Sequence, residues 1–206
     1  MRALFQRLNE TSKKDKWIFG TMLVSALLSL LAALVLSVEA INLAKNPNAT
    51  LTCSVNAVIN CASVMKHESS HLFGFPNSFI GLMAEPIVIT IAIAALAGVR
   101  FPRAFMATAQ IGYGLGLLFA YWLFYISVFV IGALCPWCLL VTVSTTLVFM
   151  SLLRFNIRES NLYFSDKLNH KLQRWTEKDY DKFLTALWLF AMLMLILTKY
   201  RDSLFT

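Results

Sequence analysis

Long apolar stretches alternate with polar segments along most of the chain. The first, residues 18–38, is an uncharged run of 21 residues. As a helix with a rise of about 1.5 Å per residue, it spans roughly 30 Å, which is the thickness of the hydrocarbon core of a bilayer. Four further apolar runs follow, at residues 78–99, 104–132, 136–153 and 183–198. The pattern predicts an all-α integral membrane protein with five transmembrane helices.

The first apolar run has a second interpretation, a cleaved signal peptide, because Val38-Glu39-Ala40 loosely resembles a cleavage site. The apolar part of a signal peptide is usually only about 7–15 residues long. The observed length of 21 residues therefore favours a retained helix.

The polar segments are a charged N-terminal segment, residues 1–17, a long loop, residues 43–77, and a charged segment, residues 154–182. In the last of these, apolar residues recur at helical spacing among lysines and arginines: Phe164, Leu168, Leu172 and Trp175. Such a basic amphipathic helix is typical of one lying on an anionic membrane surface, although a charged linker helix gives the same pattern. We expect residues 18–153 to form one unit of four spans, and residues 183–206 a fifth span with a short tail.

The composition agrees with a membrane protein and leaves no room for a separate soluble domain: of 206 residues, 58% are hydrophobic and 14% are charged. The formal net charge of +7 suits an anionic partner such as nucleic acid, but its distribution indicates membrane topology instead. Of the 18 lysines and arginines, 14 fall in residues 1–17, 100–103 and 154–182. Because basic segments stay in the cytoplasm, we place the N-terminus there. The topology accounts for the positive charge, so we expect no nucleic-acid partner.

Four cysteines form two close pairs, Cys53 with Cys61 in the long loop and Cys135 with Cys138 at the start of the fourth apolar run. In the topology above all four lie on the outer face, where disulfides form and persist. The second pair begins a helix, whose positive N-terminal end lowers the pKa of a thiol. The two pairs share one compartment and one depth, which allows exchange between them.

Three kinds of site fit these cysteines, and two of them are inert. Zinc is one, since four thiolates suit tetrahedral zinc and His67 and His71 are near in sequence, but the C-x7-C spacing is looser than usual zinc spacings. A non-catalytic membrane scaffold with two structural disulfides is the second. A disulfide within a C-x2-C turn, however, is a small strained ring that is readily reduced.

The third kind of site is a redox relay. Thiol–disulfide exchange needs a thiolate, an accessible target sulfur and a second thiol that resolves the mixed disulfide, and two cysteine pairs supply these. At a membrane surface the natural two-electron acceptor is a lipid-soluble quinone. The aromatic residues Tyr121 and Tyr125 of the third span are candidates to line its site.

Three motifs stand in order along the chain: Cys53-x7-Cys61, Gly74-Phe-Pro-Asn77-Ser78-Phe-Ile-Gly81 and Cys135-x2-Cys138. In this combination the sequence resembles the vitamin K epoxide reductase family, especially its bacterial members, over roughly residues 18–153. The resemblance implies a four-helix transmembrane bundle around a quinone, capped by the loop that holds the first cysteine pair. It also implies a function, the reoxidation of a thioredoxin-fold thiol oxidase that forms disulfides in exported proteins.

The family pattern implies a role for each matching residue. Cys53 corresponds to the thiol that exchanges with the partner, and Cys61 to the thiol that passes electrons to Cys135. Cys138 corresponds to the thiol that faces the quinone ring. Asn77 matches the asparagine that hydrogen-bonds a quinone carbonyl, and it is also well suited to cap the helix of the second span.

Two departures from the family pattern refine the expected function. Where vertebrate members have a tyrosine four residues after the C-x2-C motif, this chain has Thr142, which favours a plain quinone over vitamin K epoxide. Some bacterial relatives carry a fused thioredoxin domain after a fifth span, whereas no cysteine follows Cys138 here, so we expect a separate partner protein. Together these features imply a stand-alone thiol-disulfide oxidoreductase of the plasma or inner membrane that uses a menaquinone- or ubiquinone-type acceptor.

Glu85 lies about two turns into the second span, where a carboxyl group is costly and therefore a functional candidate. It is a candidate to donate a hydrogen bond to the quinone or to carry a proton. Alternatively, its neutral side chain satisfies the backbone carbonyl that Pro86 leaves unpaired. His67 and His71 are near enough in sequence to tune a loop thiolate, although exposed loop histidines usually have no such role.

Overall fold

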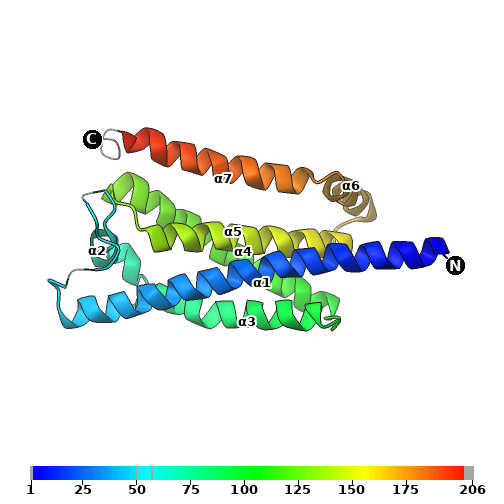
Figure 1. Ribbon diagram of the computed structural model, residues 1–206, viewed down its shortest axis with the longest axis horizontal. Helices are drawn as coiled ribbons and strands as arrows, with labels where there is room; N and C mark the ends of the chain where they lie inside the picture. The colour runs from blue at the N-terminus through cyan, green and yellow to red at the C-terminus, as the bar shows by residue number, and fades with distance from the viewer. Residues whose placement is uncertain (1, 50, 57, 202–206) are drawn as a thin grey trace.

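The computed structural model describes residues 2–49, 51–56 and 58–201, with side chains from residue 15 onward. Five helices contain segments long and apolar enough to cross a membrane, and they run along the long axis of the molecule (Figure 1). They are α1 (Arg2–Lys45), α3 (Ser78–Leu96), α4 (Arg103–Tyr125) with the π-helix η2 (Ile126–Ile131), α5 (Pro136–Arg158) and α7 (Tyr180–Lys199). The described residues contain no β-strand, only two isolated β-bridges. The predicted all-α, five-span membrane architecture is confirmed.

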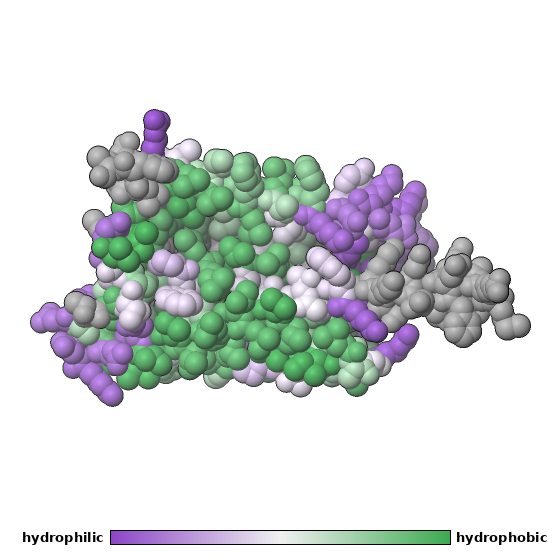
Figure 2. Space-filling view, in the orientation of Figure 1, coloured by the Kyte–Doolittle hydropathy of each residue, from purple (hydrophilic) through white to green (hydrophobic). Residues whose placement is uncertain are grey.

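Short helices lie at the two ends of the bundle. The cysteine end carries α2 (Cys61–Lys66), the 3-10 helix η1 (Glu68–His71) and the start of α5, and the opposite end, named the α6 end, carries α6 (Asp166–Glu177). Figure 2 shows a broad hydrophobic band over the middle of the length and hydrophilic residues at both ends. A bilayer accounts for this distribution, because its core favours apolar side chains and its surfaces favour polar ones. The chain is a multi-pass membrane protein.

Helix α1 extends beyond the predicted run of residues 18–38 on both sides, and its membrane-spanning segment is Asp15–Lys45. Its buried residues Phe19, Met22 and Ala26 share a hydrophobic core with residues of α3, α4 and α5. Because α1 fills the core of the bundle, this packing favours a retained helix over a cleaved signal peptide.

The seam between α1 and α3 is made of small residues. Ser37 Oγ donates to Ser78 Oγ at 2.9 Å. One turn further, a Cβ added to Gly81 would lie only 2.9 Å from the Cβ of Ala33. Small residues are typical of close helix contacts in membranes, where packing holds helices together in place of the hydrophobic effect. The close approach of α1 therefore explains the glycine of the Asn-Ser-x-x-Gly motif.

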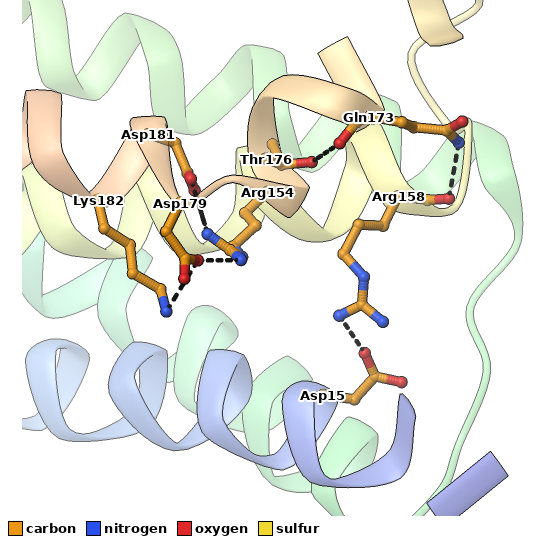
Figure 3. A network of polar contacts seen from close by, with 8 residues as sticks. All are labelled: Asp15, Arg154, Arg158, Gln173, Thr176, Asp179, Asp181 and Lys182. Carbon is orange, nitrogen blue, oxygen red and sulfur yellow. Dashed lines mark hydrogen bonds and ion pairs between the residues drawn. The ribbon is translucent and has the colours of Figure 1, made fainter. Parts of the chain in front are cut away.

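Ion pairs at the α6 end join α1, α5 and the start of α7 (Figure 3). Arg154 donates to Asp181 at 2.7 Å and to Asp179 at 2.6 Å, and Arg158 donates to Asp15 at 2.8 Å. The fourth span is predicted to end before Arg154, whereas the helix α5 itself continues to Arg158. The reason is that both arginines find acidic partners on neighbouring elements, so their charges do not end the helix.

Candidate functional site

Side-chain hydrogen bonds hold the long loop at the cysteine end together and join it to α1. Asn60 caps α2, since its Oδ1 accepts a backbone N–H of that helix at 3.1 Å, and Ser54 Oγ donates to the same oxygen at 3.2 Å. Thr52 ties the loop to α1, because its N and Oγ1 donate to the buried carboxyl group of Glu39 at 3.2 and 2.6 Å. These bonds fix the start of α2, whose first residue is Cys61.

Cys53 and Cys61 are joined by a disulfide, and their Cα atoms lie 5.6 Å apart. Cys61 is 0% exposed and Cys53 is 7% exposed. The sulfur of Cys61 also lies 3.3 Å from the sulfur of Cys135, which is a free thiol. A thiol in contact with a disulfide sulfur is in position to exchange with it.

A short stretch of backbone pairing sets this contact between sulfurs. Leu134 N donates to Val58 O at 2.6 Å, and Asn60 N donates to Leu134 O at 3.0 Å. The two paired segments run parallel, and the residue that follows each of them is a cysteine, Cys61 on one and Cys135 on the other. The register of the pairing therefore places the two sulfurs side by side.

The chain reaches this pairing through an irregular end of α4. The α-helix becomes the π-helix η2 at Ile126, and Gly132 then turns the chain with a φ of +72°, a left-handed conformation that glycine adopts without strain. Ser127 Oγ donates to Ala133 O at 2.6 Å and secures the turn. π-Helical turns within α-helices are frequent at functional sites, and this one frees the residues before α5 for the pairing.

Cys135 and Cys138 are thiols at the start of α5. Cys135 is the N-cap residue, Pro136 is the first helical residue, and Cys138 N donates to Cys135 Sγ at 3.4 Å. The pKa of the Cys135 thiol is lowered, first by a hydrogen bond from the Cys138 thiol and then by the backbone N–H groups of Cys138 and Trp137, against the opposing effect of burial. A thiol with a lowered pKa leaves a mixed disulfide faster. Cys135 is thus well suited to be the leaving group of an exchange step.

Replacement of Cys138 tests the cause of this lowered pKa. In a Cys53→Ala, Cys61→Ala background, Cys135 is the only cysteine left once Cys138 is replaced. We expect Cys138→Ser, which keeps a hydroxyl donor, to give Cys135 a lower pKa than Cys138→Ala, which has no donor. The pKa is read from the ultraviolet absorbance of the thiolate as the pH rises. Identical titration curves in the two variants would contradict the hydrogen bond as the cause.

The predicted histidines bind serines of the loop. His67 Nδ1 lies 2.9 Å from Ser69 Oγ, and His71 Nδ1 lies 2.7 Å from Ser70 Oγ. Within the described part of the chain, no group of three or more His, Cys, Asp or Glu side chains gathers as a metal site requires. The contacts of both histidines therefore order the segment that leads to α3.

Asn77 lies directly before α3, but its side chain makes no capping hydrogen bond. The predicted capping role is wrong, because a capping side chain needs an extended backbone, and Asn77 is helical with φ −57° and ψ −25°. Instead Nδ2 donates to Ser69 O at 2.7 Å, and Oδ1 is buried with no hydrogen-bond partner among the described residues. A buried acceptor without a partner costs free energy, so Oδ1 of Asn77 is still open to a hydrogen-bond donor.

Glu85 is buried between three helices. Ser29 Oγ of α1 donates to its Oε1 at 2.8 Å, and Tyr113 OH of α4 donates to the same atom at 3.1 Å. Two hydroxyl donors thus satisfy a carboxyl group that is costly when unpaired inside a membrane. These contacts link α1, α3 and α4. Among the described residues, the Glu85 side chain makes no hydrogen bond to the backbone carbonyl that Pro86 leaves unpaired.

The two predicted tyrosines have different surroundings. Tyr121 OH lies 2.7 Å from Thr146 Oγ1 of α5 and accepts from Trp188 Nε1 of α7 at 2.9 Å. Tyr125 is 56% exposed and stacks on Phe129, with ring centroids 5.1 Å apart. Trp188 was not predicted as a site residue. The sequence feature that could have indicated it is an indole N–H in the middle of a span, because such a group needs a hydrogen-bond partner there.

The model of the vitamin K epoxide reductase family matches residues 21–153. No curated protein matches the chain. The match covers well over half of the 206 residues and contains both cysteine pairs, Asn77 and the two backbone segments that bring Cys61 to Cys135. The chain therefore belongs to the vitamin K epoxide reductase family of membrane thiol-disulfide oxidoreductases.

Proposed function

We propose that this protein reoxidises a separate thioredoxin-fold thiol oxidase and passes the electron pair through its two cysteine pairs to a membrane quinone. The observation that carries the proposal is the 3.3 Å contact between the sulfur of Cys61, which is in a disulfide, and the free thiol of Cys135. Two independent structural cross-links would need no such contact, whereas a relay depends on it.

The first exchange takes place at Cys53. A thiolate of the partner attacks Cys53 Sγ, the bond between Cys53 and Cys61 breaks, and Cys61 leaves as a thiolate. The second thiol of the partner then attacks the partner's own sulfur in the mixed disulfide and releases Cys53. The partner ends as a disulfide, and the loop pair holds the two electrons as thiols.

The second exchange passes the electrons to the C-x2-C motif. Cys61 attacks Cys135 of an oxidised Cys135–Cys138 pair, and Cys138 leaves as a thiolate. Cys53 then attacks Cys61, and Cys135 leaves with the help of its lowered pKa. The state described here has the bonds expected after this step, with Cys53–Cys61 closed and the other two cysteines as thiols.

The surroundings of Asn77 fit a quinone as the electron acceptor. A quinone suits the role of terminal electron acceptor because it takes up two electrons and two protons. Asn77 offers it a buried Oδ1, which accepts from a hydroxyl, and a second amide hydrogen besides the one donated to Ser69 O. We assign Cys138 to the ring of the quinone, and Tyr121, Tyr125 and Glu85 to the remainder of its site.

We further propose that the protein lies in the plasma or inner membrane with its N-terminus in the cytoplasm and its cysteine end outside. Three segments lie at the α6 end, residues 2–17, 100–103 and 154–182, and together they hold 14 of the 18 lysines and arginines. Lys45, Lys66, Lys199 and Arg201 belong to the cysteine end. Because the more basic side of a multi-pass protein stays in the cytoplasm, the cysteines face the compartment in which disulfides persist.

A quinone-reduction assay with the purified protein tests the proposal. We expect a reduced thioredoxin-fold protein with a C-x2-C motif to drive the reduction of a soluble ubiquinone or menaquinone analogue, followed by the loss of quinone absorbance. The double variant Cys53→Ala, Cys61→Ala is the control and should be inactive with the protein dithiol. If the wild type reduces neither analogue, the protein is better described as a scaffold with a structural disulfide.

A further inference from the structure

The C-terminal end of α7 packs against the segments that hold the cysteine pairs together. Tyr200, directly after α7, is 6% exposed and shares a hydrophobic cluster with Val58, Val128 and Leu134. Val58 and Leu134 are the residues whose backbones are joined by the 2.6 Å hydrogen bond beside the cysteines. The ring of Tyr200 therefore belongs to a cluster that includes the side chains of two residues of the backbone pairing, Val58 and Leu134.

The hydroxyl of Tyr200 completes the irregular end of α4. It donates to Val128 O at 3.1 Å in buried surroundings. The backbone N–H groups of Gly132 and Ala133 both donate to Ser127 O, so neither of them donates to the carbonyl of Val128. A buried carbonyl without a partner costs free energy, and Tyr200 supplies the bond that the π-helix leaves open. Burial raises the pKa of Tyr200, which keeps the phenol protonated as a donor.

A second contact holds α7 at the same place. Lys199 Nζ lies 4.2 Å from the ring centroid of Phe129, which is a cation–π contact. Lys199, the last residue of α7, and Tyr200, which follows it, thus contact two consecutive residues of η2, Phe129 and Val128. Figure 1 shows this end of α7 at the same end of the bundle as α2 and the end of α4.

We infer that Tyr200 is a positioning residue for the exchange between Cys61 and Cys135. Its ring and hydroxyl hold the paired backbone in the register that brings the two sulfurs to 3.3 Å. Tyr200 lies outside residues 21–153, which the family model matches, so this role belongs to the fifth span and not to the matched four-span unit. The inference rests on the proposed relay, which gives the sulfur contact its function.

The test measures the sulfur contact without a partner or a quinone. In a Cys53→Ala, Cys138→Ala background, Cys61 and Cys135 form a disulfide in glutathione buffers to an extent set by their effective concentration. We expect Tyr200→Ala to lower this effective concentration at least about tenfold, and Tyr200→Phe, which loses only the hydroxyl, to lower it about threefold. Free thiols are labelled with a maleimide–polyethylene glycol reagent, and the number of labels is read from the shift of the protein band on a gel.

Phe190→Ala is the matched control, because Phe190 is an aromatic residue of α7 with a side chain that is 54% exposed. It should leave the effective concentration within about twofold of the parent. Equal values in the parent and both Tyr200 variants would overturn the inference, and so would an equal loss in Phe190→Ala. If Tyr200→Ala does not fold, the comparison of Tyr200→Phe with the parent decides by the same criterion. The disulfide measurement on these variants does not depend on the outcome of the quinone-reduction assay with the wild type. The inference and the proposed function can therefore fail separately.

Discussion

Cys61→Ser will lower the rate of electron transfer from a protein dithiol to the C-x2-C motif by at least about a thousandfold. Without this sulfur, no nucleophile lies 3.3 Å from Cys135, and Cys53 has no disulfide for the partner to attack. Serine is close to cysteine in size, so the start of α2 should keep its structure. The measurement mixes fully oxidised protein with a reduced thioredoxin-fold protein, quenches with acid and counts reduced Cys135 and Cys138 by alkylation and mass spectrometry.

Two further variants make this result specific. Ser63→Ala changes an exposed residue of the same helix and should transfer electrons at the wild-type rate. A partner with a single active-site cysteine should form a disulfide-linked adduct with the wild type and none with Cys53→Ser. If Cys61→Ser still transfers electrons at the wild-type rate, the partner delivers them directly to the C-x2-C motif, and the loop disulfide is structural.

The helices could be predicted from the sequence because a lipid environment leaves few choices to the backbone. A long uncharged run can satisfy its own polar groups in lipid only as a helix, and all five spans follow from that rule. The continuation of α5 to Arg158 could not be predicted, because the apolar run ends before Arg154. Its acidic partner Asp181 is 27 residues away in sequence, and no local pattern reports such a pairing.

The candidate site could be predicted only in part. The charge bias places all four cysteines on one side, and the resemblance to a family orders them, but neither reports the backbone pairing of Ile59 with Leu134. That pairing depends on a π-helix and on a left-handed glycine, which hydropathy does not encode. Tyr200 was missed for a related reason: an aromatic residue at the end of a span has the pattern of an ordinary interfacial anchor.

Asn77→Ala will raise the KM for quinone by about 10- to 100-fold. The change removes both the open Oδ1 acceptor and the free amide hydrogen that we propose to bind the quinone oxygens. Stability should fall by only about 1 kcal/mol, since the bond to Ser69 O is lost. No capping bond is lost with it, because the side chain makes none. Steady-state quinone reduction gives KM and kcat, and thermal unfolding gives the change in stability.

Ser78→Ala is the control for this prediction, because Ser78 is the next residue and its hydroxyl accepts from Ser37 in the seam between α1 and α3. It should leave the KM for quinone unchanged, since it removes a packing contact and no group assigned to the ligand. Electron transfer from the loop pair to Cys135 should also be unchanged in Asn77→Ala, because no residue of the backbone pairing is altered. A wild-type KM in Asn77→Ala, with a loss of stability, would make the bond to Ser69 O structural and place the quinone elsewhere in the bundle.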